Sequence, residues 1–505
     1  MNACRAAFCI PMYKGSNHGE FLGVGYLAAA LQQDNHKTRI LDEDAAYHVA
    51  AKMGASAPED WAAQWVERQL VDFGPDLVGV SISTANYENG LKLLRRVRRL
   101  LPSTLTVVGG PHITTCWKSF RSSHHDLFDF GVVQEGETAM RDIATKYCRG
   151  QALTGISGVF SSSGDSAPYR PVLHRDLDDV PFPDREGFLS PWPSEQRDLA
   201  KEHYVRGFYR FLPGFRLGGI ARIVATRGCQ HKCSFCSPSI LWQDLRTGES
   251  ALRLRKASSV ASEIDLLRSQ GARAIYFDDP MFPLISRREY ASQLLSRYIG
   301  MSKQLAFGIV THADELDAQA IEMLARAGVT YMYFGLEAHE PKWASVLGKR
   351  LPLDHAFSVL RLCEKAGIHC DVSYQLGLPG ERRDDVSRQI DWLARNFPRR
   401  NVFFSLAAVW PGTIWAANSG IGDQDYEPER RAGAANRTGL YFFPNEGLEV
   451  EQYFSNCSGA FHFVSAKDAL SIKYELIDHG FCRRFDRPEL NKQPDEARTV
   501  DHESA

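Results

Sequence analysis

Three cysteines lie close together in one short stretch of the chain. Cys229, Cys233 and Cys236 have the spacing C-x3-C-x2-C. Thiolates this near in sequence can converge on one metal centre. Structural zinc sites take four ligands, usually as two pairs, whereas a [4Fe-4S] cluster held by three cysteines leaves one iron open to bind another molecule. His231 lies between two of the cysteines, and we expect it to be exposed rather than a fourth ligand.

The cysteines lie within a series of alternating strand and helix patterns. Six apolar strands and five amphipathic helices predict an open, partial (β/α)6 barrel of the TIM type, whose active site lies at the C-terminal ends of its strands. The cysteines follow the first predicted strand and so belong to that end. The strands are predicted at 223–226, 274–277, 305–310, 331–335, 371–376 and 402–407, and the helices at 258–270, 288–299, 317–327, 353–366 and 384–396.

The first 150 residues alternate in the same way and predict a separate α/β domain. Apolar strands separated by helices indicate a doubly wound, Rossmann-like parallel sheet, which binds ligands at the carboxyl ends of its strands. The strands are predicted at 6–10, 38–41, 77–83, 105–108 and 128–133, and the helices at 22–33, 60–73, 87–101 and 137–148.

Small and polar residues stand at those carboxyl ends. They are Ser81, Ser83, Gly109, Gly110 and Glu135. Glycine lets a ligand approach the backbone closely, and serine hydroxyls can bind it. We therefore predict that these residues line a binding site.

A glycine pattern nearby resembles a dinucleotide fingerprint. Gly23 and Gly25 fit G-x-G-x-x-A, and Asp42 follows near the offset expected for ribose binding. In a dinucleotide fold, however, these glycines lie in the turn directly after the first strand. Here about a dozen residues intervene, so we expect both glycines to serve close packing of the helix on the sheet.

Two further segments complete the predicted organisation. Residues 151–220 predict a linker that packs on its neighbours, and residues 421–505 a small C-terminal extension with a disordered end. We therefore expect boundaries at 1–150, 151–220, 221–420 and 421–505. Cys457 and Cys482 in the extension are too isolated to predict a second cluster.

Composition excludes several classes of protein. The chain has 505 residues and 59 basic against 61 acidic side chains, a net charge of −2 that gives no electrostatic footprint for nucleic acid. We find no apolar run long enough for a membrane span and no signal peptide pattern. The 11 cysteines are odd in number and scattered, which favours reduced thiols and a cytoplasmic location.

The cysteine loop resembles that of the radical S-adenosylmethionine (SAM) superfamily. The resemblance implies that Cys229, Cys233 and Cys236 bind a [4Fe-4S] cluster, whose open iron binds SAM and whose reduction cleaves SAM to a 5′-deoxyadenosyl radical. It also implies a flavodoxin- or ferredoxin-type electron donor. Further SAM contacts implied by position are Phe235 before the last cysteine, Asp278 and Asp279 after the second strand, Glu337 after the fourth and Gly380 after the fifth.

The N-terminal domain resembles the cobalamin-binding domain of the cobalamin-dependent branch of that superfamily. The stretches that carry this resemblance are 23–29, 78–81, 107–112 and 133–137. The chain lacks the D-x-H-x-x-G motif that supplies a histidine to cobalt in some such domains. His18 follows the first strand, but without the aspartate and final glycine of the motif.

The resemblance implies that the chain is an enzyme. Most members of this branch are methyltransferases that act on unactivated carbons, here in a small-molecule or natural-product intermediate. The alternative is a cobalamin-free radical SAM dehydratase, epimerase or cyclase with a vestigial N-terminal domain. No residue of the sequence identifies the substrate or a catalytic acid or base.

Overall fold

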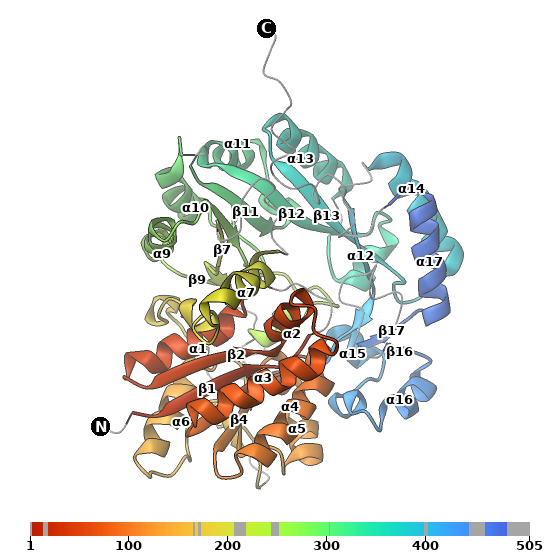
Figure 1. Cartoon of the computed structure of the whole chain (residues 1–505). Coiled ribbons are helices and arrows are strands. Elements are labelled where there is room, and N and C mark those ends of the chain that lie inside the picture. The colour runs from red at the N-terminus through yellow and green to blue at the C-terminus, as the bar shows by residue number, and fades with distance from the viewer. Residues whose placement is uncertain are drawn as a thin grey trace.

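The computed structural model contains two α/β domains and a C-terminal extension (Figure 1). It describes residues 3–13, 19–164, 167–169, 173–206, 219–243, 252–301, 304–350, 352–397, 402–443 and 460–481. His18, Cys457, Cys482 and the end of the chain, about which predictions were made, lie outside these ranges.

The N-terminal domain is built on a sheet with the strand order β2-β1-β3-β4-β5-β6. Its first five strands are parallel, and β6 pairs antiparallel with β5. The order reverses between β1 and β3, the position at which doubly wound sheets bind ligands. The strands are β1 (Arg5–Ile10), β2 (Lys37–Asp42), β3 (Leu77–Ser81), β4 (Leu105–Gly109), β5 (Phe130–Val132) and β6 (Val159–Ser161).

Helices cover both faces of this sheet. The predicted helices are present as α1 (Leu22–Gln33), α3 (Pro58–Phe73), α4 (Tyr87–Leu100) and α6 (Glu137–Cys148). Two helices were not predicted, α2 (Glu43–Lys52) and α5 (Pro111–His124). The sequence of α5 is mostly polar, and Cys116 has a non-helical backbone that interrupts it. Such a helix gives no continuous apolar stripe to detect.

The second domain is an open six-stranded barrel, as predicted. Its strand order is β7-β10-β11-β12-β13-β14, with every neighbouring pair parallel. The strands are β7 (Ile220–Ile223), β10 (Ala274–Phe277), β11 (Ala306–Thr311), β12 (Val329–Glu337), β13 (His369–Leu376) and β14 (Val402–Leu406). The helices between them are α9 (Ala257–Ser269), α10 (Arg288–Leu295), α11 (Ala318–Ala327), α13 (Leu353–Lys365) and α14 (Arg383–Asn396), with the short α12 (Lys342–Leu347) after β12.

The first barrel strand lies three residues earlier than predicted. The barrel pairing ends at Ile223, and the backbone N–H groups of Ala225 and Thr226 donate to the Asp279 carboxylate instead, at 2.9 and 2.6 Å. The chain then forms β8 (Thr226–Arg227), which pairs antiparallel with β9 (Arg253–Leu254) outside the barrel sheet. The predicted strand 223–226 was therefore wrong in position, because a side chain replaces the sheet as hydrogen-bond partner.

The remaining elements connect and cover the two domains. Helix α7 (Ser194–Arg206) packs on α2, and α17 (Ala466–Asp478) lies beside α14 (Figure 1). The other elements are α8 (Pro238–Leu241), α15 (Ile414–Asn418), α16 (Arg431–Thr438), β15 (Ala408–Val409), β16 (Tyr441–Phe443) and β17 (Ala460–His462), and the 3-10 helices 84–86, 177–179, 186–188, 296–298, 313–315 and 423–426. Among the described residues, no helix is both long and apolar enough to cross a membrane.

Candidate active site

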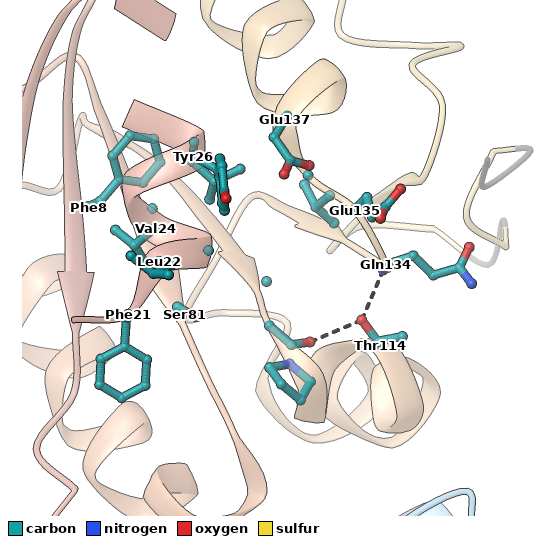
Figure 2. Close-up of a pocket in the computed structure, with 18 of the residues that line it drawn as sticks. Phe8, Phe21, Leu22, Val24, Tyr26, Ser81, Thr114, Gln134, Glu135 and Glu137 are labelled. Carbon is teal, nitrogen blue, oxygen red and sulfur yellow. Dashed lines mark hydrogen bonds between the residues drawn. The ribbon is translucent and has the colours of Figure 1, made fainter. Parts of the chain in front are cut away.

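A cavity of about 500 Å³ lies where the carboxyl edge of the N-terminal sheet faces the barrel. Figure 2 shows part of its lining, with Phe8, Leu22 and Tyr26 on one side and Gln134 and Glu135 on another. The barrel contributes Arg222, Val224, Thr226, Arg227, Asp278 and Pro280, together with Leu241 and Trp242 just after the three cysteines. The volume is in the range of small-molecule and cofactor sites, which is about 300–1,000 Å³.

Four of the five residues predicted at the sheet edge line this cavity. They are Ser81, Gly109, Gly110 and Glu135. Ser83 is not part of the lining. Its backbone N–H donates to Asn86 Oδ1 at 2.8 Å, in the turn that leads into α4. Ser83 therefore orders the chain beside the site rather than facing the cavity.

Glycines shape the cavity at two of its walls. Gly110 has a φ of +103°, and a Cβ there would lie 2.6 Å from the carbonyl oxygen of Ile82. Gly23 on α1 also lines the cavity, and a Cβ there would meet nothing within 4 Å. The prediction that Gly23 and Gly25 pack helix α1 closely on the sheet was wrong, because Gly23 has no close neighbour and Gly25 packs on Pro183 of the linker at 3.1 Å. Asp42 caps α2 through the backbone N–H groups of Asp44 and Ala45.

Several lining residues were not predicted. Helix α1 presents Leu22 and Tyr26 to the cavity, and the signal that could have identified them is that α1 begins at the carboxyl edge of β1. Gln134 has a φ of +62°, which is unusual for a residue other than glycine. Its backbone N–H donates to Thr114 Oγ1 at 2.9 Å, and its amide Nε2 donates to the carbonyl oxygen of Gln243 at 2.6 Å.

The three cysteines lie half-buried on one loop after β8. The backbone N–H of Ser234, in the middle of this loop, donates to the carbonyl oxygen of Leu347 at 2.8 Å, which ties the loop to the barrel. Burial raises the pKa of all three thiols. That of Cys236 rises to about 12, with Cys233 and Cys229 adding to the effect because they lie near it. A bound cationic metal centre would overcome this cost of forming thiolates.

His231 is not fully exposed as the sequence suggested. It is half-buried, and its ring stacks on that of His312 with 4.2 Å between centroids. Burial lowers the pKa of both imidazoles, that of His312 to about 3. The backbone N–H of His231 faces the sulfur of Cys229 at 3.5 Å.

The structure separates the two aspartates predicted to contact SAM. Asp279 is buried and, as described above, accepts from the backbone of Ala225 and Thr226. Its burial raises its pKa to about 7. Asp278 instead lines the cavity between the domains and pairs with Arg222. Asp279 therefore binds the backbone just after the first barrel strand, whereas Asp278 lies at the cavity.

The remaining predicted SAM contacts lie at the carboxyl ends of the barrel strands. Glu337 ends β12 with a φ of +68°, and its carboxylate accepts from Ser373 at 2.8 Å and from Gln375 at 3.1 Å. Phe235 contacts Trp415 with 5.6 Å between ring centroids. Gly380 has a φ of +81°, and a Cβ there would meet nothing within 4 Å.

A buried group of charges connects the cysteine loop to the N-terminal domain. Arg227 donates to Glu135 at 3.0 Å and to Glu137 at 2.6 Å. Arg253 donates to both carboxylate oxygens of Glu135, at 2.8 and 2.9 Å. Burial alone would raise the pKa of Glu135 and Glu137, but the arginines outweigh it and hold both pKa values below their ordinary range. Both carboxylates are therefore ionised, and each forms an ion pair with arginine.

Comparison with known families assigns both domains. Residues 16–144 match the B12 binding domain, and residues 223–393 match the radical SAM superfamily. The chain is 23% identical over 402 residues to an uncharacterized methyltransferase of Pyrococcus horikoshii, covering 79% of this chain and 78% of that protein. It is also 23% identical over 413 residues to cytidylyl-2-hydroxyethylphosphonate methyltransferase of Streptomyces wedmorensis, covering 74% of this chain and 72% of that protein.

Solved structures share the fold. The radical SAM methyltransferase TsrM from Kitasatospora setae, with cobalamin and a [4Fe-4S] cluster bound, superposes with a TM-score of 0.66 at 18% identity, covering 94% of this chain and 89% of that chain. The cobalamin-dependent SAM radical enzyme OxsB with aqua-cobalamin bound gives a TM-score of 0.64 at 13% identity, covering 94% and 66%.

The chain thus carries a B12 binding domain followed by a radical SAM domain and is homologous to the cobalamin-dependent radical SAM methyltransferases. It is an enzyme of that kind. The two domains imply three cofactors: a [4Fe-4S] cluster and SAM for the radical SAM domain, and cobalamin for the B12 binding domain.

The residues of the site fit these groups. Three half-buried thiols on one loop match the ligand set of a cluster with one open iron. The cavity between the domains has a largely apolar lining, and the missing side chain at Gly23 leaves open space along one wall, which suits a bulky ring such as the corrin.

Proposed function

We propose that the enzyme methylates an unactivated carbon of a small-molecule intermediate and that cobalamin occupies the cavity between its two domains. The observation that carries this proposal is the composition of the cavity walls. Leu241 and Trp242, which follow the cysteine loop directly, line the same cavity as Ser81, Gly109 and Gly110 of the B12 binding domain. The two cofactor sites therefore share a wall, as a reaction that needs both cofactors at one substrate requires.

The proposal gives each part of the chain a task. Cys229, Cys233 and Cys236 hold the cluster, while Asp279 and Glu337 orient SAM. When the cluster, SAM and cobalamin are all bound, they would supply hydrogen abstraction and methyl transfer at one position of the substrate. The protein's part is to bind, orient and exclude water, as in cofactor enzymes generally.

The relatives support a small-molecule substrate. The printed names of two of them, cytidylyl-2-hydroxyethylphosphonate methyltransferase and tryptophan 2-C-methyltransferase, state small polar substrates.

The proposal also includes a cytoplasmic location and a flavodoxin- or ferredoxin-type donor, because a reducing compartment keeps the cluster thiols available. A cobalamin-free dehydratase, epimerase or cyclase is not favoured by these relatives. The domain limits at about residues 150, 220 and 420 belong to the same proposal, with β6 (Val159–Ser161) of the predicted linker joining the N-terminal sheet.

Isotope transfer tests the reaction. The reconstituted enzyme is incubated with a reductant, SAM carrying a deuterated methyl group, and a small-molecule extract of the source cells. We expect a product that carries the deuterated methyl group, together with 5′-deoxyadenosine. Formation of 5′-deoxyadenosine with consumption of a metabolite but no transfer of the label would contradict methylation and favour a dehydratase, epimerase or cyclase.

A further inference from the structure

Two arginines face each other at the base of the cysteine loop. Strands β8 and β9 pair antiparallel, with Arg227 directly opposite Arg253. The two strands flank residues 228–252, which include all three cysteines. Like charges directly opposite on neighbouring strands destabilise the pairing. Both arginine side chains are only 11% exposed, so solvent does little to screen them.

One carboxylate from the other domain bridges both arginines. Glu135 follows β5 of the B12 binding domain, and its side chain is 4% exposed. Its Oε1 accepts from Arg227 at 3.0 Å and from Arg253 at 2.9 Å, while its Oε2 accepts from Arg253 at 2.8 Å. Glu135 thus joins the two strands that close the cysteine loop.

The surrounding contacts keep Glu135 in place. The backbone N–H of His174, in the segment between the domains, donates to Glu135 Oε2 at 2.6 Å, and the carbonyl oxygen of His174 accepts from Arg253 at 2.7 Å. Glu137 takes a second N–H of Arg227 at 2.6 Å, and His174 Nε2 lies 3.5 Å from its other oxygen. The ring of Tyr26 lies 5.1 Å from the Arg227 guanidinium.

We propose that Glu135 is a positioning residue for the iron-sulfur cluster: by binding Arg227 and Arg253 together, the B12 binding domain closes the loop that holds the cluster. The carboxylate of Glu135 binds Arg227, Arg253 and the backbone of His174. Its effect on the cluster is exerted through the β8–β9 pair. It follows that the radical SAM domain depends on its N-terminal neighbour for a stable cluster site. This requires only that the loop binds a cluster, and does not depend on which reaction the enzyme catalyses.

The charge opposition gives the proposal a distinctive test. Glu135→Gln removes the carboxylate and leaves two opposed, buried arginines. The double variant Glu135→Gln/Arg253→Gln also lacks the bridge but relieves the repulsion. The double variant should therefore retain the cluster longer than the single variant does. If Glu135 contributed only its contacts, removing Arg253 as well would not improve cluster retention.

The measurement is iron retained per chain after anaerobic reconstitution and a timed challenge with a chelator, together with hydrogen exchange of residues 226–243 and 252–254 in the iron-free protein. For Glu135→Gln we expect about 10-fold faster cluster loss and faster exchange in these segments, with partial recovery of both in the double variant. The matched control is Glu43→Gln, which removes another buried carboxylate of the same domain, paired with Arg96, away from the loop. This control should retain iron like the unaltered protein.

The outcomes separate the possible failures. Unaltered iron retention in Glu135→Gln, or a double variant that loses iron faster than the single variant, would overturn the proposal. If Glu135→Gln does not fold, Arg253→Gln decides. The Arg253→Gln variant leaves Glu135 bound to Arg227 and removes the opposed charge. It should therefore lose iron more slowly than the double variant. Iron loss as fast as that of the double variant, or faster, would refute the role of Glu135. Cys233→Ala sets the baseline without a cluster, and iron retained by this variant would instead show that the cluster assignment itself is wrong.

Discussion

Arg227, two residues before Cys229, donates a 2.6 Å hydrogen bond to Glu137, the first residue of α6 in the B12 binding domain. Both side chains are buried. Removing one partner of such a buried pair costs about 3–5 kcal/mol, since it leaves a charge without compensation. The two domains are therefore joined by buried charges beside the cavity between them.

Replacement of the loop cysteines tests the cluster site. Cys229→Ala, Cys233→Ala and Cys236→Ala should each lose bound iron and form no 5′-deoxyadenosine from SAM, because each removes one of three ligands. Cys363→Ala, which removes a buried thiol from α13 in the same barrel, should retain both properties. Retained 5′-deoxyadenosine formation in all three loop variants would refute the assignment.

Filling the cavity from α1 should exclude cobalamin. Gly23→Val places its side chain in open space along the cavity wall, so the iron-free and cobalamin-free protein should keep its melting temperature. Hydroxocobalamin binding should weaken by about 1–3 kcal/mol, the usual cost of overpacking. Gly433→Val on α16, where a Cβ also meets nothing within 4 Å, is the control and should bind normally. Equal affinity in both variants, measured by absorbance titration, would place cobalamin elsewhere.

Replacing Gly110 at the cavity even by alanine should lower the free energy of unfolding. Gly110→Ala combines a φ of +103° with a Cβ 2.6 Å from a carbonyl oxygen, whereas Gly380→Ala has a φ of +81° and no close neighbour. Strain of this kind costs about 1–3 kcal/mol. Urea unfolding should show the larger loss for Gly110→Ala. A loss at Gly380 equal to that at Gly110 would mean that the clash with Ile82 is relieved by movement.

Asp42 should make stability depend on pH. Burial, with Asp44 adding to it, raises its pKa from 3.8 to about 7. Because the folded protein binds this proton more tightly than the unfolded chain, the contribution is full below the unfolded pKa and is lost as pH rises through about 7. Relative to Asp42→Asn, which keeps a helix-capping side chain, the unaltered protein should lose about 2 kcal/mol of unfolding free energy between about pH 5 and 7. Parallel stability curves would show that the Asp42 pKa is ordinary.

The sequence allowed most of the architecture to be predicted, but not the contacts between the domains. Strand β10 and helices α1 and α6 have the bounds predicted for them, because their apolar patterns are local. The rule that ligands bind at the carboxyl ends of parallel strands was enough to place Ser81 and Gly109 at the cavity.

The errors arose where side chains from distant segments decide the structure. The first barrel strand was misplaced because Asp279, more than fifty residues away, takes its backbone hydrogen bonds. Glu135 lies at the cavity as predicted, but its ion pairs with Arg227 and Arg253 were not foreseen. No local spacing or periodicity indicates pairs of residues about a hundred positions apart.

The most direct test of the account is anaerobic reconstitution with iron, sulfide and hydroxocobalamin, followed by gel filtration and metal analysis of the protein peak. We expect iron and stoichiometric cobalt on the same peak. The Gly23→Val variant should contain less cobalt per chain, and the Cys233→Ala variant should contain less iron per chain. Iron without cobalt would contradict the role of the cavity as a cobalamin site and would leave a cobalamin-free radical SAM reaction as the alternative.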